Sequence, residues 1–240
     1  LSRQLARQSV DSRHNYCQIM SKTTKTAAAA LWIQEADCIL ICAGAGLSHK
    51  SGSGECVYTS AADFQSKYPD FVAEESHSIS TAYEAMSLFS DAHVPLGVKW
   101  GFWARHMENQ RYRFTPSAGY ASLLRMIEGK SSFIYTSNVD GCFERSGFDA
   151  SAIYTPQGDW SHYQCLAPCA ADSVFASRPM LDGVLHTLPD GVAAVPPAAI
   201  PTCPRCGGST FGNVRGGSWF LHAPYEAQHA RFLAWVDDIV

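Results

Sequence analysis

Two short, continuous runs of apolar residues, each followed by glycine or small polar residues, organise the first half of the chain. The first spans residues 38–42 and stops at Gly44 and Gly46, and the second spans residues 133–136. Continuous apolar runs of this length are typical of parallel strands buried on both faces, and glycines permit a tight turn at the strand end. The pattern therefore predicts two strands of one parallel sheet.

Helical patterns surround these strands. The alanine-rich residues 26–36 predict a first helix, and residues 225–240 predict a last one with its apolar side chains on one face. Between the strands, apolar residues recur at helical spacing over 120–127, and Gly129 follows as the stop. Residues 219–222 are expected to form a further strand. Strand, helix and strand in this order indicate an α/β fold with a Rossmann-like parallel sheet.

The segment 165–210 differs from the rest of the chain. It is rich in Cys, Pro, Ala and Gly and shows little periodicity. We interpret it as a small module inserted into the sheet domain, which then consists of residues 26–164 and 211–240. We interpret residues 1–25 as a tail or targeting segment.

Composition narrows the functional class. The chain is 46% hydrophobic and 17% charged with a formal net charge of -4, and no apolar run is long enough to span a bilayer. The weak negative charge argues against direct nucleic-acid binding, which relies on a basic patch. Nine cysteines, with two close pairs at 165/169 and 203/206, favour reduced thiols and a metal site in an intracellular protein over a disulfide framework.

The first 25 residues are basic and contain serines, and Asp11 is their only acidic residue. We interpret them as a tail, with Met20 as the true start, and expect a cytoplasmic location. A mitochondrial transit segment, which is also rich in Arg and Ser, is the alternative.

The two cysteine pairs, Cys165-x3-Cys169 and Cys203-x2-Cys206, are separated by 33 residues. Short pairs of this kind form the two knuckles of a tetrahedral Cys₄ zinc site. Four thiolates leave no coordination position for water or substrate, so the site is expected to be structural. Chance pairing in a cysteine-rich chain is the alternative.

The glycine turn after the first strand is a candidate nucleotide-binding loop. Gly44, Ala45 and Gly46 are followed by Ser48, and the backbone N–H groups of such a turn can approach a pyrophosphate. Because His49 takes the place of the third glycine of the dinucleotide motif, a plain glycine turn is an equally good interpretation.

Polar residues also follow the second strand, at the edge where ligands of open α/β sheets collect. Asn138 can hydrogen-bond a ribose hydroxyl or a water molecule, and Asp140 can accept a hydrogen bond from an amide. The alternative for each residue is a turn position that caps the next helix.

Taken in order, these motifs resemble those of sirtuins. They are Gly44-Ala45-Gly46-Leu47-Ser48, Thr136-Ser137-Asn138-Val139-Asp140, Gln157-Gly158 and the two cysteine pairs. The resemblance runs from about residue 30 to the end. It implies an NAD-dependent protein deacylase or ADP-ribosyltransferase, with NAD bound by the Rossmann-like domain and zinc by the inserted module.

Three departures from the sirtuin pattern bear on activity. Sirtuins use the histidine of a His-Gly pair as the general base for deacylation, and Gln157 stands at that place. A glutamine amide cannot take a proton near neutral pH, so deacylation by that route is expected to fail. In sirtuins a glycine of this region is followed by Ile-Pro-Asp, whereas here Gly52 is followed by Ser-Gly-Glu at residues 53–55. Sirtuins also return to the sheet after the zinc module, and because the sequence stops at Val240 we expect a truncated C-terminal part.

The departures themselves resemble a subgroup, the class-M or macrodomain-linked sirtuins. The matching stretches are 102–106, 136–143 and 157–160. The resemblance implies ADP-ribosyl transfer from NAD rather than deacylation, with Asn138 and Gln157 as the catalytic residues. It also implies an acceptor protein as partner, with a lipoyl-carrier protein as the candidate.

The same resemblance assigns the NAD contacts. Asp140 would hold the carboxamide of nicotinamide. The pyrophosphate would be cradled by Gly44, Ala45, Gly46 and Ser48.

Two other functions stay open. A deacylase could use water or another histidine as base, and His162 is the nearest in sequence. A non-enzymatic module that binds NAD or ADP-ribose would also fit the missing base and the short C-terminus.

Overall fold

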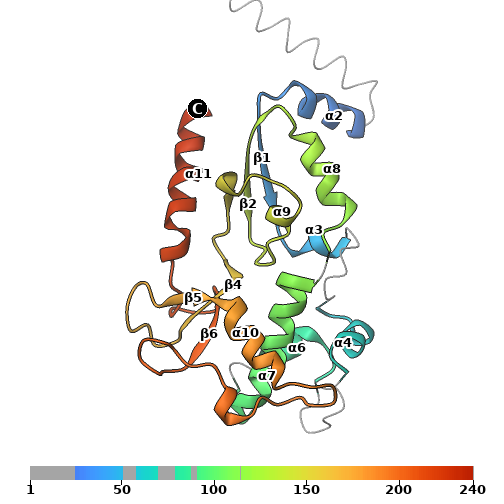
Figure 1. Ribbon diagram of the computed structural model, residues 1–240. Coiled ribbons are helices and arrows are strands. Elements are labelled where there is room, and N and C mark those ends of the chain that lie inside the picture. The colour runs from blue at the N-terminus through green and yellow to red at the C-terminus, as the bar shows by residue number, and fades with distance from the viewer. Residues whose placement is uncertain (1–24, 51–57, 70–78, 88–90, 114, 240) are drawn as a thin grey trace, which may run out of the picture.

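A computed structural model describes residues 25–50, 58–69, 79–87, 91–113 and 115–239 of the chain (Figure 1). Apart from Lys25, the predicted tail lies outside these residues. Residues 53–55, where the sequence differs from the sirtuin motif, lie outside them as well. None of the helices within the described ranges is long and apolar enough to cross a membrane.

The first sheet contains the two predicted strands. β1 (Cys38–Ala43) and β2 (Ser131–Thr136) pair in parallel, and β3 (Ile153–Tyr154) pairs in parallel with the other edge of β2. The strand order is β1-β2-β3. The predicted parallel α/β sheet is therefore confirmed.

Helices cover both faces of this sheet (Figure 1). α8 (Ala118–Met126) packs on one face around a small core that includes Tyr120 and Ile134. α11 (Glu226–Ile239) packs on the other, where the rings of Phe232 and Trp235 lie 5.3 and 5.7 Å from that of Phe133. Both helices were predicted, as was α2 (Lys25–Glu35) ahead of β1.

The prediction that β1 is buried on both faces is wrong. Leu40 of β1 is 43% exposed, although Phe133, its partner on β2, is buried. β1 is the edge strand of the described sheet, and α11 lies over β2 and β3 through contacts with Phe133 and Tyr154. The α11 face of β1 is therefore open to solvent.

A second sheet is antiparallel, with strand order β5-β4-β6. Its strands are β4 (Gly158–Cys165), β5 (Val174–Ala176) and β6 (Thr210–Val214). α10 (Ser177–His186) and α7 (Leu96–Met107) pack beside it. The ring of Trp103 on α7 lies 4.9 Å from that of Phe211 and 5.5 Å from that of Trp160, which forms the larger aromatic core.

Short helices connect these layers. They are α3 (Ala45–Lys50), α4 (Ala61–Lys67), α6 (Ala82–Ser87), the π-helix η2 (Glu108–Arg113), α9 (Cys142–Arg145), and the 3₁₀ turns η3 (Ala150–Ala152), η4 (Pro197–Ala199) and η5 (Ala223–Tyr225). The division of the chain at 165 and 210 stays a prediction.

Residues 219–222 do not form the expected strand. They form an irregular segment whose backbone is hydrogen-bonded by a side chain instead of a neighbouring strand. The Gln164 amide donates to the carbonyl of Trp219 (2.7 Å) and accepts from the N–H of Leu221 (3.0 Å). Because one buried amide satisfies these backbone groups, the apolar run needs no strand partner.

Gly158, at the start of β4, is expected to tolerate no side chain. Its φ is +95°, and a Cβ would lie 2.1 Å from the carbonyl oxygen of Asn213. We expect Gly158→Ala to lower the free energy of unfolding by about 3 kcal/mol, from the backbone strain and the clash together. Urea denaturation followed by circular dichroism measures this.

The matched control is Gly183→Ala in the exposed part of α10, where an added Cβ meets no atom within 4 Å. It is expected to raise the free energy of unfolding by about 0.5–1 kcal/mol, because alanine favours the helix. Equal changes in the free energy of unfolding for the two substitutions would contradict the backbone strain and clash assigned to a side chain at position 158.

Candidate functional site

The carboxyl ends of β1 and β2 meet at one edge of the first sheet. The N–H of Ser137 donates to the carbonyl of Ala43 (3.0 Å), which holds the loop after β2 against the glycine turn after β1. In an open α/β sheet this edge is where ligands bind. The two polar motifs predicted from the sequence therefore lie together.

Ser48 is the centre of a buried hydrogen-bond network at this edge. Its hydroxyl donates to Asp140 Oδ2 (2.9 Å) and accepts from Asn138 Nδ2 (3.3 Å). The hydroxyl of Tyr120 lies 2.9 Å from the same Oγ. A carboxylate only accepts, so Ser48 donates to Asp140 and receives the other two hydrogen bonds.

The network is shielded from water. Ser48 and Tyr120 are fully buried, and Asn138 and Asp140 are 7% and 3% exposed. Burial raises the pKa of Asp140, although the N–H of Cys142 (2.8 Å) and the Ser48 hydroxyl donate to it. Burial and the nearby Asp140 carboxylate raise the pKa of Tyr120 as well, so the phenol stays protonated as a donor.

Asn138 and Asp140 line a small cavity of about 90 Å³. Trp160 and Tyr58 give it aromatic walls, and Gln110 of η2 adds a polar group. The remaining lining residues are Ala45, Ser137 and Val139. An aromatic pocket with a few convergent polar groups is the usual form of a small-molecule site.

The glycine turn lines an adjoining hollow of about 360 Å³. Gly44, Ala45 and Gly46 belong to it, and Ala45 is shared with the cavity of Asn138. An added Cβ at Gly46 would meet no atom within 4 Å, so the backbone there is accessible. Ser48 lies outside both hollows and faces the buried network instead.

Gln157 is not brought into this cavity. It is half-buried just before β4, its backbone carbonyl accepts from the N–H of Arg215 (2.8 Å), and it lines neither hollow. β4 is nevertheless joined to the site, because the N–H of Trp160 donates to the carbonyl of Val139 (3.0 Å). A catalytic role for Gln157 stays a prediction.

His162, the candidate base for deacylation, does not line the cavity either. It sits on β4 opposite Ala176 of β5, and its Nδ1 is 3.0 Å from the hydroxyl of Ser161. Burial lowers the pKa of His162. No histidine is among the described residues that line the cavity of Asn138.

Arg111 ties the cavity walls together and was not found from the sequence. Its guanidinium donates to Asp159 Oδ1 (2.9 Å) on β4 and to Glu144 Oε2 (3.0 Å) on α9. Burial raises the pKa of Glu144, and so does the neighbouring Asp159, while Arg111 opposes them. Arg111 thus fixes η2 against both β4 and α9.

The four paired cysteines converge as predicted. Their sulfur atoms all lie within 4.8 Å of one another, with Cys165 and Cys206 3.7 Å apart and Cys169 and Cys203 3.9 Å apart. Four thiolates at the usual zinc–sulfur distance are about 3.8 Å apart in a tetrahedron. Gly207, with φ of +72°, makes the turn after the second pair. The geometry fits a structural Cys₄ metal site.

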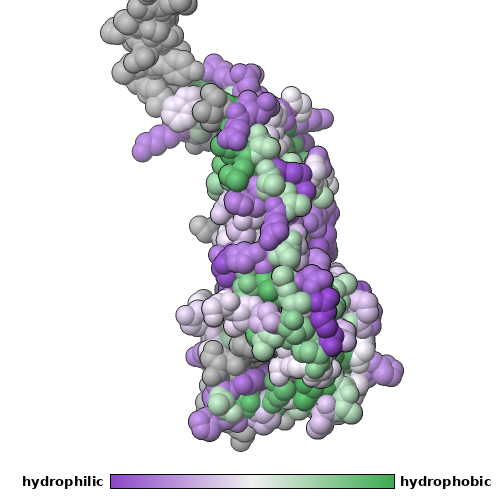
Figure 2. All heavy atoms as spheres, turned by 90° about the vertical axis from the view of Figure 1, so that its left-hand side faces the viewer, coloured by the Kyte–Doolittle hydropathy of each residue, from purple (hydrophilic) through white to green (hydrophobic). Residues whose placement is uncertain are grey.

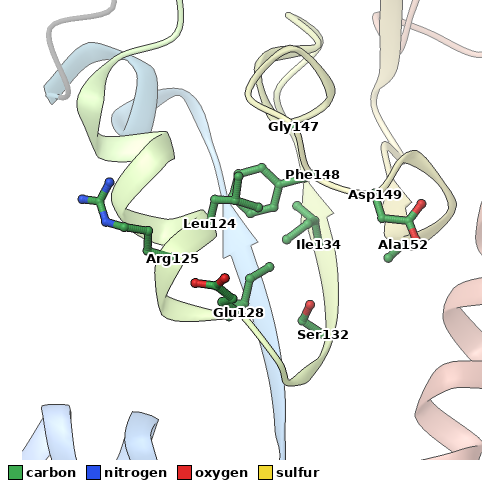
Figure 3. A pocket seen from close by; sticks show the side chains of 10 residues that line it. Leu124, Arg125, Glu128, Ser132, Ile134, Gly147, Phe148, Asp149 and Ala152 are labelled. Atoms are coloured by element: carbon green, nitrogen blue, oxygen red, sulfur yellow. The ribbon is translucent and has the colours of Figure 1, made fainter.

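A larger cavity, of about 470 Å³, lies between α8 and β2 (Figure 3). Figure 3 shows Leu124, Ile134 and Phe148 converging in it from α8, β2 and the loop after α9. None of the residues predicted for catalysis or nucleotide binding lines it. Its lining combines these apolar side chains with Arg125, Glu128, Ser132 and Asp149.

Ser48→Ala tests the network. The substitution removes one hydroxyl that serves three buried partners, and we expect it to lower the free energy of unfolding by about 2–3 kcal/mol. Ser122→Ala on the exposed side of α8 is the control and is expected to change it by less than about 0.5 kcal/mol. Similar values from urea denaturation would show that the network does not stabilise the fold.

Comparison with solved structures defines the fold. The chain is similar to a triple mutant of a Sir2 homologue in complex with 2′-O-acetyl ADP-ribose, with a TM-score of 0.52 and 18% identity over 82% of this chain and 66% of that one. The fold is that of a sirtuin. A single mutant of a Sir2 homologue in complex with ADP-ribose gives a TM-score of 0.50 with 20% identity, covering 87% of this chain and 69% of that one. The expected sirtuin-like α/β fold is confirmed.

Two curated proteins are similar to this chain in sequence. A probable bifunctional ADP-ribose hydrolase/ADP-ribosyltransferase of Fusarium oxysporum f. sp. cubense is 31% identical over 207 residues, which are 85% of this chain and 33% of that protein. A protein ADP-ribosyltransferase of Staphylococcus aureus is 25% identical over 222 residues, which are 90% of this chain and 65% of that protein. The chain thus spans less than two thirds of either relative. No protein-family model matches it.

Proposed function

We propose that the chain is an NAD-dependent protein mono-ADP-ribosyltransferase of the sirtuin type. The observation that carries this is the cavity beside Asn138 and Asp140, which has aromatic walls and no histidine among its described lining residues. Both curated relatives are named as ADP-ribosyltransferases, which supports transfer over deacylation.

NAD would bind along the edge formed by the ends of β1 and β2. The turn at 44–46 supports binding of the pyrophosphate, because its backbone borders an open hollow that shares Ala45 with the cavity. The nicotinamide half would enter the cavity, where Asp140 would accept from its carboxamide. Ser48 is already committed to three buried partners, so we propose that it positions Asn138 and Asp140 rather than touching the pyrophosphate.

The proposed reaction breaks the bond between nicotinamide and C1′ of the ribose and forms a bond from C1′ to a nucleophile of the acceptor, whose proton leaves to solvent. Nicotinamide is the leaving group. Positive charge develops on the sugar, so the site must orient the ribose and exclude water. Asn138, whose Nδ2 is fixed on Ser48, has its side-chain oxygen available to accept from a ribose hydroxyl. Gln157 would orient the ribose or the acceptor from the β4 side.

The acceptor is proposed to be a protein. The resemblance to class-M sirtuins supports a lipoyl-carrier protein as that acceptor, and the bifunctional name of the fungal relative supports a link to ADP-ribose hydrolysis.

Zinc is proposed for the four-cysteine site. The sulfur separations and the four-thiolate donor set fit this ion. Since Cys165 ends β4 and the other ligands lie in loops, the ion would hold irregular segments to the second sheet.

The test is incubation of the 240-residue chain with NAD labelled in the ADP-ribose part and a lipoyl-carrier protein. Labelled acceptor and released nicotinamide in equal amounts are expected. Release of O-acyl-ADP-ribose from an acylated peptide would favour deacylation. Calorimetric binding of NAD without nicotinamide release would favour a binding module, and either result would overturn the transferase.

A further inference from the structure

Gln110 has a buried amide whose oxygen is unpaired. The residue is 2% exposed on η2, and its Oε1 has no hydrogen-bond partner in the part of the chain that the structure describes. Buried polar atoms without partners are rare in native proteins and call for an explanation. Because Gln110 lines the same cavity as Asn138 and Asp140, a ligand donor in that cavity would supply the missing partner.

The position of Gln110 does not depend on its own amide. Its neighbour Arg111 holds η2 through hydrogen bonds to Asp159 and Glu144. η2 is a π-helix that follows α7 directly, and π-helical turns are frequent at functional sites. Arg111 therefore fixes η2 in place, and the adjacent side chain of Gln110 lines the cavity.

The polar groups of the cavity are complementary to a ligand that donates. Asp140 offers a carboxylate, Gln110 offers an unpaired amide oxygen, and Asn138 uses its Nδ2 on Ser48. Trp160 and Tyr58 supply flat apolar walls. A planar heteroaromatic ring that bears a carboxamide NH₂ meets both requirements better than a sugar does, because its faces are apolar and its edge donates.

We propose that Gln110 is a specificity-determining residue of this cavity, and that its side-chain carbonyl accepts a hydrogen bond from the carboxamide NH₂ of nicotinamide. The inference rests on the proposed function, which supplies NAD as the ligand. Gln110 is then a second acceptor beside Asp140, so that each N–H of the carboxamide has a partner.

The experiment compares calorimetric affinities for NAD and for 3-acetylpyridine adenine dinucleotide, in which a methyl group replaces the NH₂. The unmodified chain is expected to prefer NAD by about tenfold, because the analogue leaves a buried acceptor unpaired. Gln110→Met, which removes the acceptor, is expected to reduce this preference to about twofold or less. Gln110→Glu, which keeps an acceptor, is expected to retain it.

Thermal denaturation separates recognition from a structural role. Gln110→Met is expected to melt at the temperature of the unmodified chain or above it, since no partner is lost. The matched control is Gln164→Met: the Gln164 amide accepts from Asn213 and Leu221, so this variant is expected to melt lower while keeping the preference for NAD.

Each other outcome counts against the inference. A full preference for NAD in Gln110→Met, or a much lower melting temperature of that variant, would overturn the role of Gln110 while the proposed function stands. Failure of the unmodified chain to bind either dinucleotide would overturn the proposed function and this inference with it.

Discussion

Cys203→Ser is expected to lower the free energy of unfolding by more than about 4 kcal/mol, because structural zinc contributes on the order of 10 kcal/mol to folding. Cys203 is buried, and its sulfur lies 3.9 Å from that of Cys169. Losing one of four thiolates opens the coordination sphere and leaves the β4–β5 loop and the segment before β6 without their common anchor. A strong chelator is expected to have the same effect on the unmodified chain.

The measurement combines zinc content by mass spectrometry with thermal denaturation. We expect about one zinc ion per unmodified chain and less than about half of one in Cys203→Ser. Cys42→Ser, at an exposed position of β1, is the control and is expected to keep both zinc and stability. A metal-free chain with an unchanged melting temperature would show that the four sulfurs do not form a structural metal site.

Asn138→Ala is expected to reduce the rate of ADP-ribosyl transfer by about a hundredfold or more, because a positioned polar group at a developing charge is worth about that factor. Asn138 lines the cavity and is anchored on Ser48, so its removal leaves the ribose without a fixed partner. The truncation removes one hydrogen bond to Ser48, so the fold is expected to persist.

The assay measures initial rates of nicotinamide release at saturating NAD. Asn109→Ala is the control, because Asn109 is half-buried one residue before Gln110 and lines a different hollow. This variant is expected to release nicotinamide at the rate of the unmodified chain. A similar loss in Gln157→Ala would support the predicted second catalytic residue. Equal rates for Asn138→Ala and the unmodified chain would refute the assignment of Asn138.

The sequence was sufficient to predict β1 and β2, whose ends carry the two polar motifs, but not β4, which follows Gln157 and ends at Cys165. β1 and β2 are short apolar runs that end at glycine or at polar residues, and the topology of parallel strands brings those ends together. The spacing of the cysteine pairs equally predicted that their four sulfur atoms come together, which the structure confirms. These features depend on local pattern, which is why they could be predicted.

The rest of the site comes from residues whose local pattern is ordinary. Tyr120 matches the apolar face of α8, and its hydroxyl contact with Ser48 spans 72 positions of the chain. Gln110 and Arg111 lie in a π-helix, whose wider winding has no clear signal in the sequence. Gln157 shows the opposite case, because its motif was recognised but the structure does not bring its amide into the cavity of Asn138.

The most direct test is a crystal structure of the chain with ADP-ribose or NAD bound. We expect the pyrophosphate to lie against the backbone of residues 44–46 and the nicotinamide-side ribose to lie beside Asn138. A ligand bound instead between Leu124 and Phe148, in the cavity of Figure 3, would contradict it.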